Sequence, residues 1–486
     1  MTVVYFTRDD HEPIIDPAIP EGWELVVGCE VHCELSTETK LFCGCQNKFG
    51  EEPNRNICPV CLGLPGSMPS VNAAAVEYAM RLGLALNAEV QGSVFSRKNY
   101  FYPDMPKDYQ TTQFDLPTNV GGHLDLPNGV RVHLERAHIE EDTGKSTHIG
   151  GSGRIHDATH SLVDYNRAGV PLVEIVSRPD IHRIEDAKAY ASELRAILLA
   201  IDVCDAKMEE GSMRVDANVS VRPLGSNELR TRCEVKNINS IRSLGRAIEY
   251  EANRHIDLYN SGESPNQETR HWDEAGGRSI SGRSKEDSDD YRYFAEPDLV
   301  PLVPTDEEIQ HIRDTMPMLP AARRTRLLDA SSADPEAVDL VVGRGQDDLA
   351  FEVIAGGGNG NSVVKHLTNN LADGIGQMSI ESFVALLQME TAGDLSSTQT
   401  KTVLADLVAT GGNPTEIAAS HGFEAMDNSE LEGILDQLIA ENPDEWARFA
   451  GGDRKVQGFF VGKIMKATRG QADGKVVNQL MQSKMG

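Results

Sequence analysis

Four cysteines in two close pairs give the sharpest chemical signal in the sequence. One residue separates Cys43 from Cys45, two separate Cys58 from Cys61, and twelve lie between the pairs. Two pairs of thiolates on tight turns are typical ligands of tetrahedral zinc, and four protein ligands leave no open position for catalysis. The spacing therefore predicts a structural zinc ion; the alternative is four unrelated thiols. The other cysteines lack this spacing and are expected in the core: Cys29, Cys33, Cys204 and Cys233.

A second group of candidates alternates along the stretch GCEVHCEL. In a β-strand successive side chains point to opposite faces, so Glu30, His32 and Glu34 share one face. A carboxylate and an imidazole on one face can bind a divalent cation. The alternative is an ordinary solvated face of a sheet.

The same alternation recurs in TRCEVKN and MRVDANVSVR, and a carboxylate interrupts a third segment, PLVEIV. In TRCEVKN, Glu234 lies on the face of Arg232 and Lys236. Glu174 interrupts the apolar stretch PLVEIV, where an unpaired carboxylate would be costly. In MRVDANVSVR one face carries an unusually long polar row: Arg214, Asp216, Asn218, Ser220 and Arg222.

Acids among bases and amides on one sheet predict a site for Mg²⁺ and a polyphosphate, since Mg²⁺ binds a few carboxylates together with phosphate oxygens. Arg214, Asn218 and Lys236 are the groups expected to bind the nucleotide. Phosphoryl transfer needs mainly positioning and neutralisation of charge. The sequence has no Walker-type GxxxxGKS/T loop and no protein-kinase signature, so we expect an ATP site built on the sheet.

Two segments mix aromatic rings with charges, FSRKNYFYPDMPKDYQ at 95–110 and SGRSKEDSDDYRYFAEPD at 281–298. In the first, Lys98 and Lys107 stand among tyrosines. Ring stacking beside cations suits the single-stranded end of an RNA. The alternatives are core tyrosines in the first segment and a solvated charge run in the second.

The elements expected to position these residues form an α+β chain. From about Glu21 to about Pro304, short alternating apolar runs predict a sheet, interrupted by helices at 71–88 and 184–201. Beyond Pro304 the periodicity is helical. A chain of this length holds more than one domain. We predict an N-terminal extension at 1–20, a catalytic domain with the zinc insertion at 21–304, a helical domain at 305–424 and a small helical tail domain at 425–486.

The net charge of −29, from 75 acids against 46 bases, would repel nucleic acid at long range. Two interpretations keep RNA as a partner: an acidic surface suited to a salt-rich cytoplasm, or a local basic face. Residues 451–486 favour the second, with seven bases against two acids. The N-terminus does not resemble a secretory signal, and no apolar run approaches the roughly 20 residues that span a bilayer. We expect a cytoplasmic protein that makes no membrane contact.

Eight motifs, in order, closely resemble those of the B subunits of aspartyl/glutamyl-tRNA amidotransferases: GCEVHCEL, FCGC with CPVCLGLPGSMP, RKNYFYPDMPKDYQ, IEEDTGKSTH, VDYNRAGVPLVEIVS, MEEGSMRVDANVSVRP, EVKNINS and RSKEDSDDYRYF. The C-terminal FFVGKIMKATRGQADGKVVNQLM is similar to the tail domain of the same subunits. The resemblance covers nearly the whole chain. Each motif is weak alone, but their ordered set is specific.

The resemblance implies a cradle domain with an antiparallel sheet related to the catalytic fold of glutamine synthetase and guanido kinases. It implies that ATP phosphorylates the side-chain carboxylate of aspartate or glutamate on a misacylated tRNA, and that ammonia from a glutaminase then displaces the phosphate. The implied assembly is a heterotrimer with the glutaminase A subunit and a small C subunit. The implied cofactors are ATP, Mg²⁺ and a structural Zn²⁺.

Site residues also follow from the resemblance. The residue pattern left Glu140 and Glu141 open, and the resemblance implies Glu141, which together with Lys107 is expected to be catalytic. Lys107 would line the path of ammonia. The implied magnesium ligands are Glu30, His32, Glu141, Glu174, Asp216 and Glu234. The tail would contact tRNA through Lys463, Lys466 and Arg469.

Departures from the family pattern are few. Arg178 stands where an acid is usual, and Ala295 replaces a proline. Two other functions compete with this interpretation. A ligase acting on free amino acids would have no use for the basic tail, and a zinc-stapled RNA-binding adaptor without catalysis would leave the carboxylate-rich face unexplained.

Overall fold

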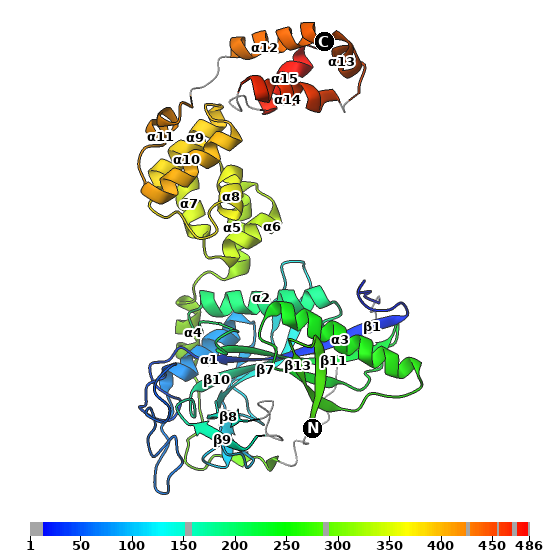
Figure 1. Ribbon diagram of the computed structural model, residues 1–486. Helices are drawn as coiled ribbons and strands as arrows, with labels where there is room; N and C mark the ends of the chain where they lie inside the picture. The colour runs from blue at the N-terminus through cyan, green and yellow to red at the C-terminus, as the bar shows by residue number, and fades with distance from the viewer. Residues whose placement is uncertain are drawn as a thin grey trace. The chain divides into compact units, whose positions relative to one another are not determined.

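The computed structural model describes residues 13–150, 158–284, 291–423, 428–453, 456–468 and 474–484 (Figure 1). It forms two compact units, Met1–Leu319 and Pro320–Gly486. Fifteen helices and a large mixed sheet within the described ranges confirm the predicted α+β class. The relation to the glutamine synthetase fold and the predicted domain boundaries stay predictions.

Ten strands of the first unit form the main sheet. All its pairs are antiparallel except β12 with β13. The expected antiparallel sheet is therefore corrected to a mixed one, because the helix α3 (Ile241–Asn260) crosses from β12 to β13 and lets them run parallel. The order is β14 (Arg278–Ser284), β13 (Glu268–Asp273), β12 (Cys233–Lys236), β11 (Met213–Pro223), β1 (Trp23–Glu34), β10 (Pro171–Ser177), β7 (Arg131–Glu141), β5 (Asn119–Val120) and β2 (Glu89–Val90), with β6 (His123–Asp125) also paired to β7.

Two smaller sheets lie in the same unit. One has three strands, β15 (Phe294–Ala295), β3 (Ser96–Asn99) and β4 (Tyr109–Thr112). The other is a hairpin of β8 (Lys145–Ile149) and β9 (His160–Asp164). The three-stranded sheet joins the two aromatic segments of the sequence, because β3 and β4 come from 95–112 and β15 from 294–295.

The two faces of the main sheet differ in chemistry. Val27, Cys29 and Val31 of β1 are fully buried in a core that includes α2 (Ile184–Ala200) and α3, which lie over the same side of the sheet in Figure 1. The alternate positions of β1, from Glu30 to Glu34, carry half-buried polar side chains. The predicted alternation is thus present, and it leaves a polar face on the side away from these helices.

Two further helices complete the first unit. The helix α1 (Ala73–Ala85) begins after Asn72, whose Oδ1 accepts a hydrogen bond from the N–H of Ala74. The helix α4 (Asp306–Asp314) packs on α1, because Ile312 is buried against Met80 and Leu84. The helices predicted at 71–88 and 184–201 correspond to α1 and α2.

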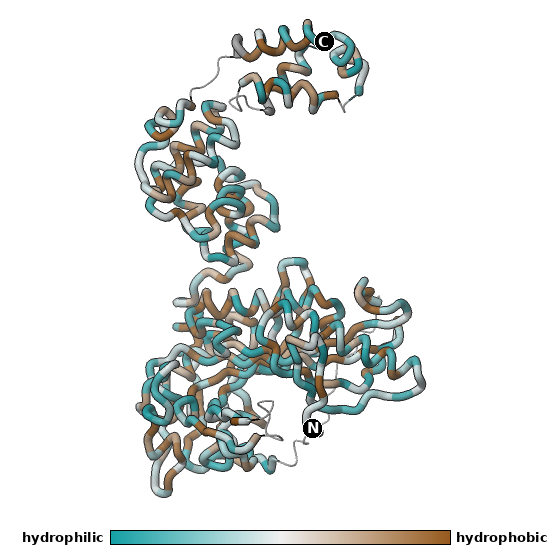
Figure 2. The backbone as a smooth tube through the Cα atoms, in the orientation of Figure 1, coloured by the Kyte–Doolittle hydropathy of each residue, from teal (hydrophilic) through white to brown (hydrophobic). Residues whose placement is uncertain are grey.

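The second unit is helical wherever the structure describes it. One core joins α5 to α11 and a second joins α12 to α15. Figure 2 shows brown, apolar turns among teal ones along these helices, as expected of amphipathic helices. No described helix combines the length and the apolar character that crossing a membrane requires. The helices are α5 (Pro320–Ser331), α6 (Pro335–Gly343), α7 (Asp347–Ala355), α8 (Gly360–Asn369), α9 (Ile380–Ala392), α10 (Ser397–Thr410), α11 (Pro414–Ser420), α12 (Asn428–Glu441), α13 (Pro443–Ala450), α14 (Gln457–Ala467) and α15 (Gly474–Ser483).

Candidate active site

Three side chains from neighbouring strands meet on the polar face of the main sheet. His32 on β1 stands opposite Glu174 on β10, and Glu140 lies on β7, the next strand. His32 Nε2 is 3.5 Å from Glu174 Oε2 and 3.7 Å from Glu140 Oε1. One ligand atom of each residue lies within 4.8 Å of the others. Imidazole and carboxylate donors at this spacing can hold one divalent cation.

Burial and close charges perturb the pKa values of this group. Burial would lower the pKa of His32, but the hydrogen bond and charge of Glu174, then the charge of Glu140, raise it to about 9. Burial, and then the charge of Glu174, raise the pKa of Glu140 to about 7. Burial also opposes ionisation of Glu174, but His138 and His32 hold its pKa well below the usual range. A cation placed between the two carboxylates would relieve their repulsion, so the group fits a metal ion.

A cavity of about 450 Å³, called here the first cavity, contains this group. Charged side chains of β11 and β12 stand at its side. Lys236 Nζ is 2.6 Å from Asp216 Oδ2 and 3.1 Å from Glu234 Oε1. Arg214 Nη2 donates to Asp142 Oδ2 at 2.9 Å. Acids and bases that are far apart in the sequence therefore gather around one cavity.

A second cavity, of about 470 Å³, continues along the same strands. Glu30 lines it and accepts a hydrogen bond on Oε1 from Asn218 Nδ2 at 2.8 Å. The Oδ1 atom of Asn218 is buried without a hydrogen-bond partner in the described part of the chain. Glu30 stands opposite Asp216 in the strand register, so the two cavities adjoin. Four arginines line the second cavity and suit an anion: Arg136, Arg178, Arg230 and Arg232.

Glu141 belongs to a third cavity, of about 250 Å³. Its carboxylate forms an ion pair with Lys107 and accepts a hydrogen bond from the backbone N–H of Thr111 at 2.8 Å. Cys43 and Cys61 line the same cavity. The two residues expected to be catalytic, Glu141 and Lys107, are thus in contact beside the cysteine group.

The first and third cavities are separated by the segments that carry Glu140 with Glu141 and Gln110 with Thr111, called here the wall. Glu140 and Glu141 are neighbours on β7 and therefore point to opposite faces. Gln110 of β4 lines the first cavity and donates to the backbone carbonyl of Glu141 at 2.8 Å, whereas Thr111 lines the third. Glu140 belongs to the group with His32 and Glu174, whereas Glu141 lies outside it. The structure therefore places Glu140, rather than the expected Glu141, beside His32 and Glu174; the binding of a metal by either glutamate stays a prediction.

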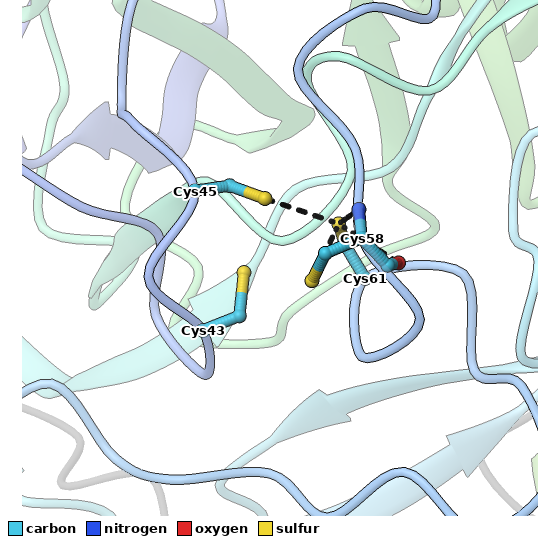
Figure 3. A group of neighbouring side chains, drawn as sticks. All are labelled: Cys43, Cys45, Cys58 and Cys61. Carbon is cyan, nitrogen blue, oxygen red and sulfur yellow. Dashed lines mark hydrogen bonds between the residues drawn. The ribbon is translucent and has the colours of Figure 1, made fainter.

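The four predicted zinc ligands face one another from two loops (Figure 3). Cys45 Sγ is 3.9 Å from Cys61 Sγ, which is 3.6 Å from Cys58 Sγ. A hydrogen bond from Cys43 lowers the pKa of Cys61 to about 5, against the effect of burial. Zinc–sulfur bonds of about 2.3 Å in a tetrahedron place sulfur atoms about 3.8 Å apart. The group fits a zinc ion in distance and in donor chemistry.

The remaining cysteines are buried, as predicted: Cys29, Cys33, Cys204 and Cys233. Cys233 also lies within 4.8 Å of ligand atoms of Glu251 and His255. Glu251, however, forms ion pairs with Arg254 and Arg270. Two guanidinium groups already neutralise its carboxylate, so this group is an ion-pair network rather than a metal centre.

The predicted tRNA-binding residues lie in the second unit. Lys463 on α14 donates to Asn442 Oδ1 at 2.9 Å, and its ammonium lies 4.6 Å from the ring centroid of Phe459. Lys466, on the same helix, is exposed. Arg469 lies outside the described residues. Contact with RNA stays a prediction here.

Sequence reasoning missed several polar side chains of the first cavity, among them Asp142, Asn239 and His271. Asp142 had a signal, because it follows the two glutamates of IEED directly. Asn239 lies in the motif EVKNINS, whereas His271 had no signal, since only the pairing of β12 with β13 brings its segment to the cavity.

Comparison with known proteins shows the family of the chain. A family model described as "GatB/GatE catalytic domain" matches residues 25–310, and one described as "GatB domain" matches residues 359–485. The chain is similar to proteins named as the B subunit of aspartyl/glutamyl-tRNA(Asn/Gln) amidotransferase. It is 44% identical over 479 residues to that of Mycobacterium sp. (strain KMS), covering 94% of this chain and 95% of the relative. It is 44% identical over 505 residues to that of Nocardioides sp. (strain ATCC BAA-499 / JS614), covering 100% of both.

Proposed function

Since this chain belongs to the family of aspartyl/glutamyl-tRNA(Asn/Gln) amidotransferase B subunits, we propose that it uses ATP to activate the side-chain carboxylate of misacylated Asp-tRNA(Asn), Glu-tRNA(Gln) or both. Ammonia from a partner glutaminase, the A subunit, then converts the activated group into the amide. A small C subunit completes the heterotrimer. Activation is needed because a carboxylate is a poor acyl donor until phosphate makes it a leaving group.

The observation that carries this proposal is the group of His32, Glu140 and Glu174 in a cavity that also holds Lys236 and Arg214. The three acidic or imidazole groups, with Asp216 beside them, would hold Mg²⁺. Bound there, Mg²⁺ would neutralise charge on the phosphate oxygens. An adaptor that performs no chemistry would have no need for buried carboxylates whose mutual repulsion destabilises the fold.

Basic groups of the two adjoining cavities account for the binding of the two anionic substrates. Lys98, Lys236 and Arg214 line the first cavity. Lys236 and Arg214 keep their predicted role beside the phosphates of the nucleotide, and Lys98 suits the carboxylate to be phosphorylated. The amide of Asn218 and the arginines of the second cavity suit the nucleotide. In the reaction, a carboxylate oxygen takes the γ-phosphoryl group of ATP and ADP leaves. Ammonia then attacks the acyl carbon and phosphate leaves with the electrons of the broken C–O bond.

Glu141 and Lys107 are proposed to serve the ammonia step. They form an ion pair in the third cavity, on the opposite side of the wall that carries Glu140. An ammonium ion arriving on that side meets Glu141, which can accept its proton and release ammonia. Lys107 holds the carboxylate of Glu141 in place through this ion pair. The zinc ion, held by the four cysteines, would fix the loops that line the same cavity.

The proposal is tested by ATP hydrolysis in the reconstituted complex with its glutaminase partner. Asp-tRNA(Asn) and Glu-tRNA(Gln) are added in turn, each against the same tRNA without an amino acid. Stimulation by one aminoacylated tRNA supports activation and identifies the substrate. Binding of both tRNAs without any stimulation would contradict the proposal and favour the zinc-stapled RNA-binding adaptor.

A further inference from the structure

Three tyrosine rings beside the first cavity have no part in the chemistry above. Tyr291, Tyr100 and Tyr102 are called here the tyrosine row. The ring centroids of Tyr291 and Tyr100 are 6.4 Å apart and those of Tyr100 and Tyr102 are 6.0 Å apart, with edge-to-face geometry in both pairs. Tyr102, at one end, is 40% exposed. The row therefore offers aromatic surface to an incoming molecule.

The other end of the row reaches the first cavity. The ammonium of Lys98 lies 4.8 Å from the ring centroid of Tyr291, and Lys98 lines that cavity with His32 and Glu140. Burial, and then the charge of Glu140, raise the pKa of Tyr100, whose ring lies in the middle of the row. A molecule lying along the row would thus have one end beside the carboxylate group.

Aromatic rings that lead to a cation are a surface that single-stranded nucleic acid recognises, because each base can stack on a ring and each phosphate can pair with the cation. A stable protein interface instead needs a broad, continuous contact area. We propose that the tyrosine row stacks with the unpaired 3′-terminal nucleotides of the aminoacylated RNA and guides the esterified amino acid into the first cavity. This inference rests on the proposed function, since that function supplies an RNA with a reacting 3′ end.

The test uses the reconstituted complex and a tRNA whose 3′-terminal adenine is replaced by 2-aminopurine, a base whose fluorescence falls when it stacks. We expect quenching by the wild-type complex and a dissociation constant for quenching that rises about five-fold or more in Tyr102→Ala, the loss typical of one stacked base. Tyr102→Phe keeps the ring and should restore quenching. Phe49→Ala removes an aromatic side chain that is 79% exposed elsewhere in the same unit and should change nothing.

Equal quenching by the wild type and Tyr102→Ala, or no quenching by the wild type, would overturn the inference. Loss of co-elution of Tyr102→Ala with the glutaminase partner, while quenching is unchanged, would assign the row to a protein interface and would also overturn it. The measurement needs neither ATP nor ammonia. A complex that shows ring-dependent quenching yet consumes no ATP with aminoacylated tRNA would contradict the proposed function and leave the stacking site in place.

Discussion

Two adjacent glutamates on β7 have different roles in this account because a strand turns neighbouring side chains to opposite faces. Glu140 lies with His32 and Glu174, whereas Glu141 pairs with Lys107 across the wall. Residue types allowed both assignments. Only the register of β7 against β10 and β1, which pairs segments far apart in the sequence, selects Glu140.

Lys107→Gln should separate the two half-reactions. Loss of the ammonium leaves Glu141 without its ion-pair partner on the ammonia side, while the first cavity is untouched. We expect aminoacyl-tRNA-stimulated ATP consumption to continue and amide formation to fall about 10²-fold or more, the usual contribution of a positioned proton acceptor. Both rates are measured on the complex, with Lys188→Gln on α2 as the matched control. Equal loss of ATP consumption would show that Lys107 serves activation instead.

Much of the site was predictable from residue types and strand alternation. Glu30, His32, Glu174, Asp216 and Glu234 were found because a carboxylate or imidazole on a strand stands out against its apolar neighbours. The division of Glu30 and Asp216 between two cavities was not predictable, since the two residues lie on different strands and only the pairing of those strands places one in each cavity. The alternation along a strand determines which face of the sheet a side chain occupies, and the long-range pairing of strands determines which residues lie next to it.

At the scale of elements, α3 explains why the sheet is mixed. The helix returns the chain so that β13 runs parallel to β12, and the buried carboxylate of Glu251 on α3 ties it to β13 through Arg270. Before Pro304 the sequence predicts helices only at 71–88 and 184–201, so neither α3 nor the choice between a hairpin and a crossover after EVKNINS follows from it. The sequence contains no local signal that distinguishes them, because the choice depends on where α3 docks.

Glu251→Gln should destabilise the first unit. The change leaves Arg254 and Arg270 without their buried partner, and breaking a buried pair costs about 3–5 kcal/mol. Burial opposes ionisation of Glu251, but His255 and Arg254 lower its pKa below the ordinary value. Its stabilisation is therefore complete above about pH 4.3, the ordinary glutamate pKa, and declines as the pH falls below that value.

Urea unfolding at pH 7 and at pH 3 checks this prediction, with Glu249→Gln on the exposed side of α3 as the matched control. The free energy of unfolding of wild type and Glu251→Gln should differ strongly at pH 7 and less at pH 3. A difference that is the same at both values would contradict the assignment of the effect to the charge of Glu251.

The cysteine loops should depend on zinc for their fold. Four thiolates within 4.8 Å repel one another unless a cation joins them. We expect about one zinc ion per chain by elemental analysis, and a lower unfolding temperature in Cys61→Ser or after chelation. Cys204→Ser, at a buried cysteine outside the group, should retain its zinc. Full zinc content in Cys61→Ser would contradict a four-cysteine site.

At the scale of the whole molecule, the net charge of −29 makes any RNA contact local. Lys463 and Lys466 on α14 are the described bases of the predicted tail contact. Changing both to Gln should weaken tRNA binding and reduce the slope of log affinity against log salt by about 1–2, since each lost phosphate contact lowers it by nearly one. Filter binding at several salt concentrations measures this. An unchanged slope would place the contact elsewhere.

The group of His32, Glu140 and Glu174 on the polar face of the sheet is proposed to hold the Mg²⁺ that serves phosphoryl transfer. The most direct test replaces ammonia with hydroxylamine, which traps an acyl phosphate on the tRNA as a hydroxamate. Wild type and Asp125→Asn, an exposed control, should form the hydroxamate with ATP and aminoacylated tRNA, whereas Glu174→Gln should lose about 10²-fold or more of that rate. Hydroxamate formation at the wild-type rate in Glu174→Gln would contradict the claim.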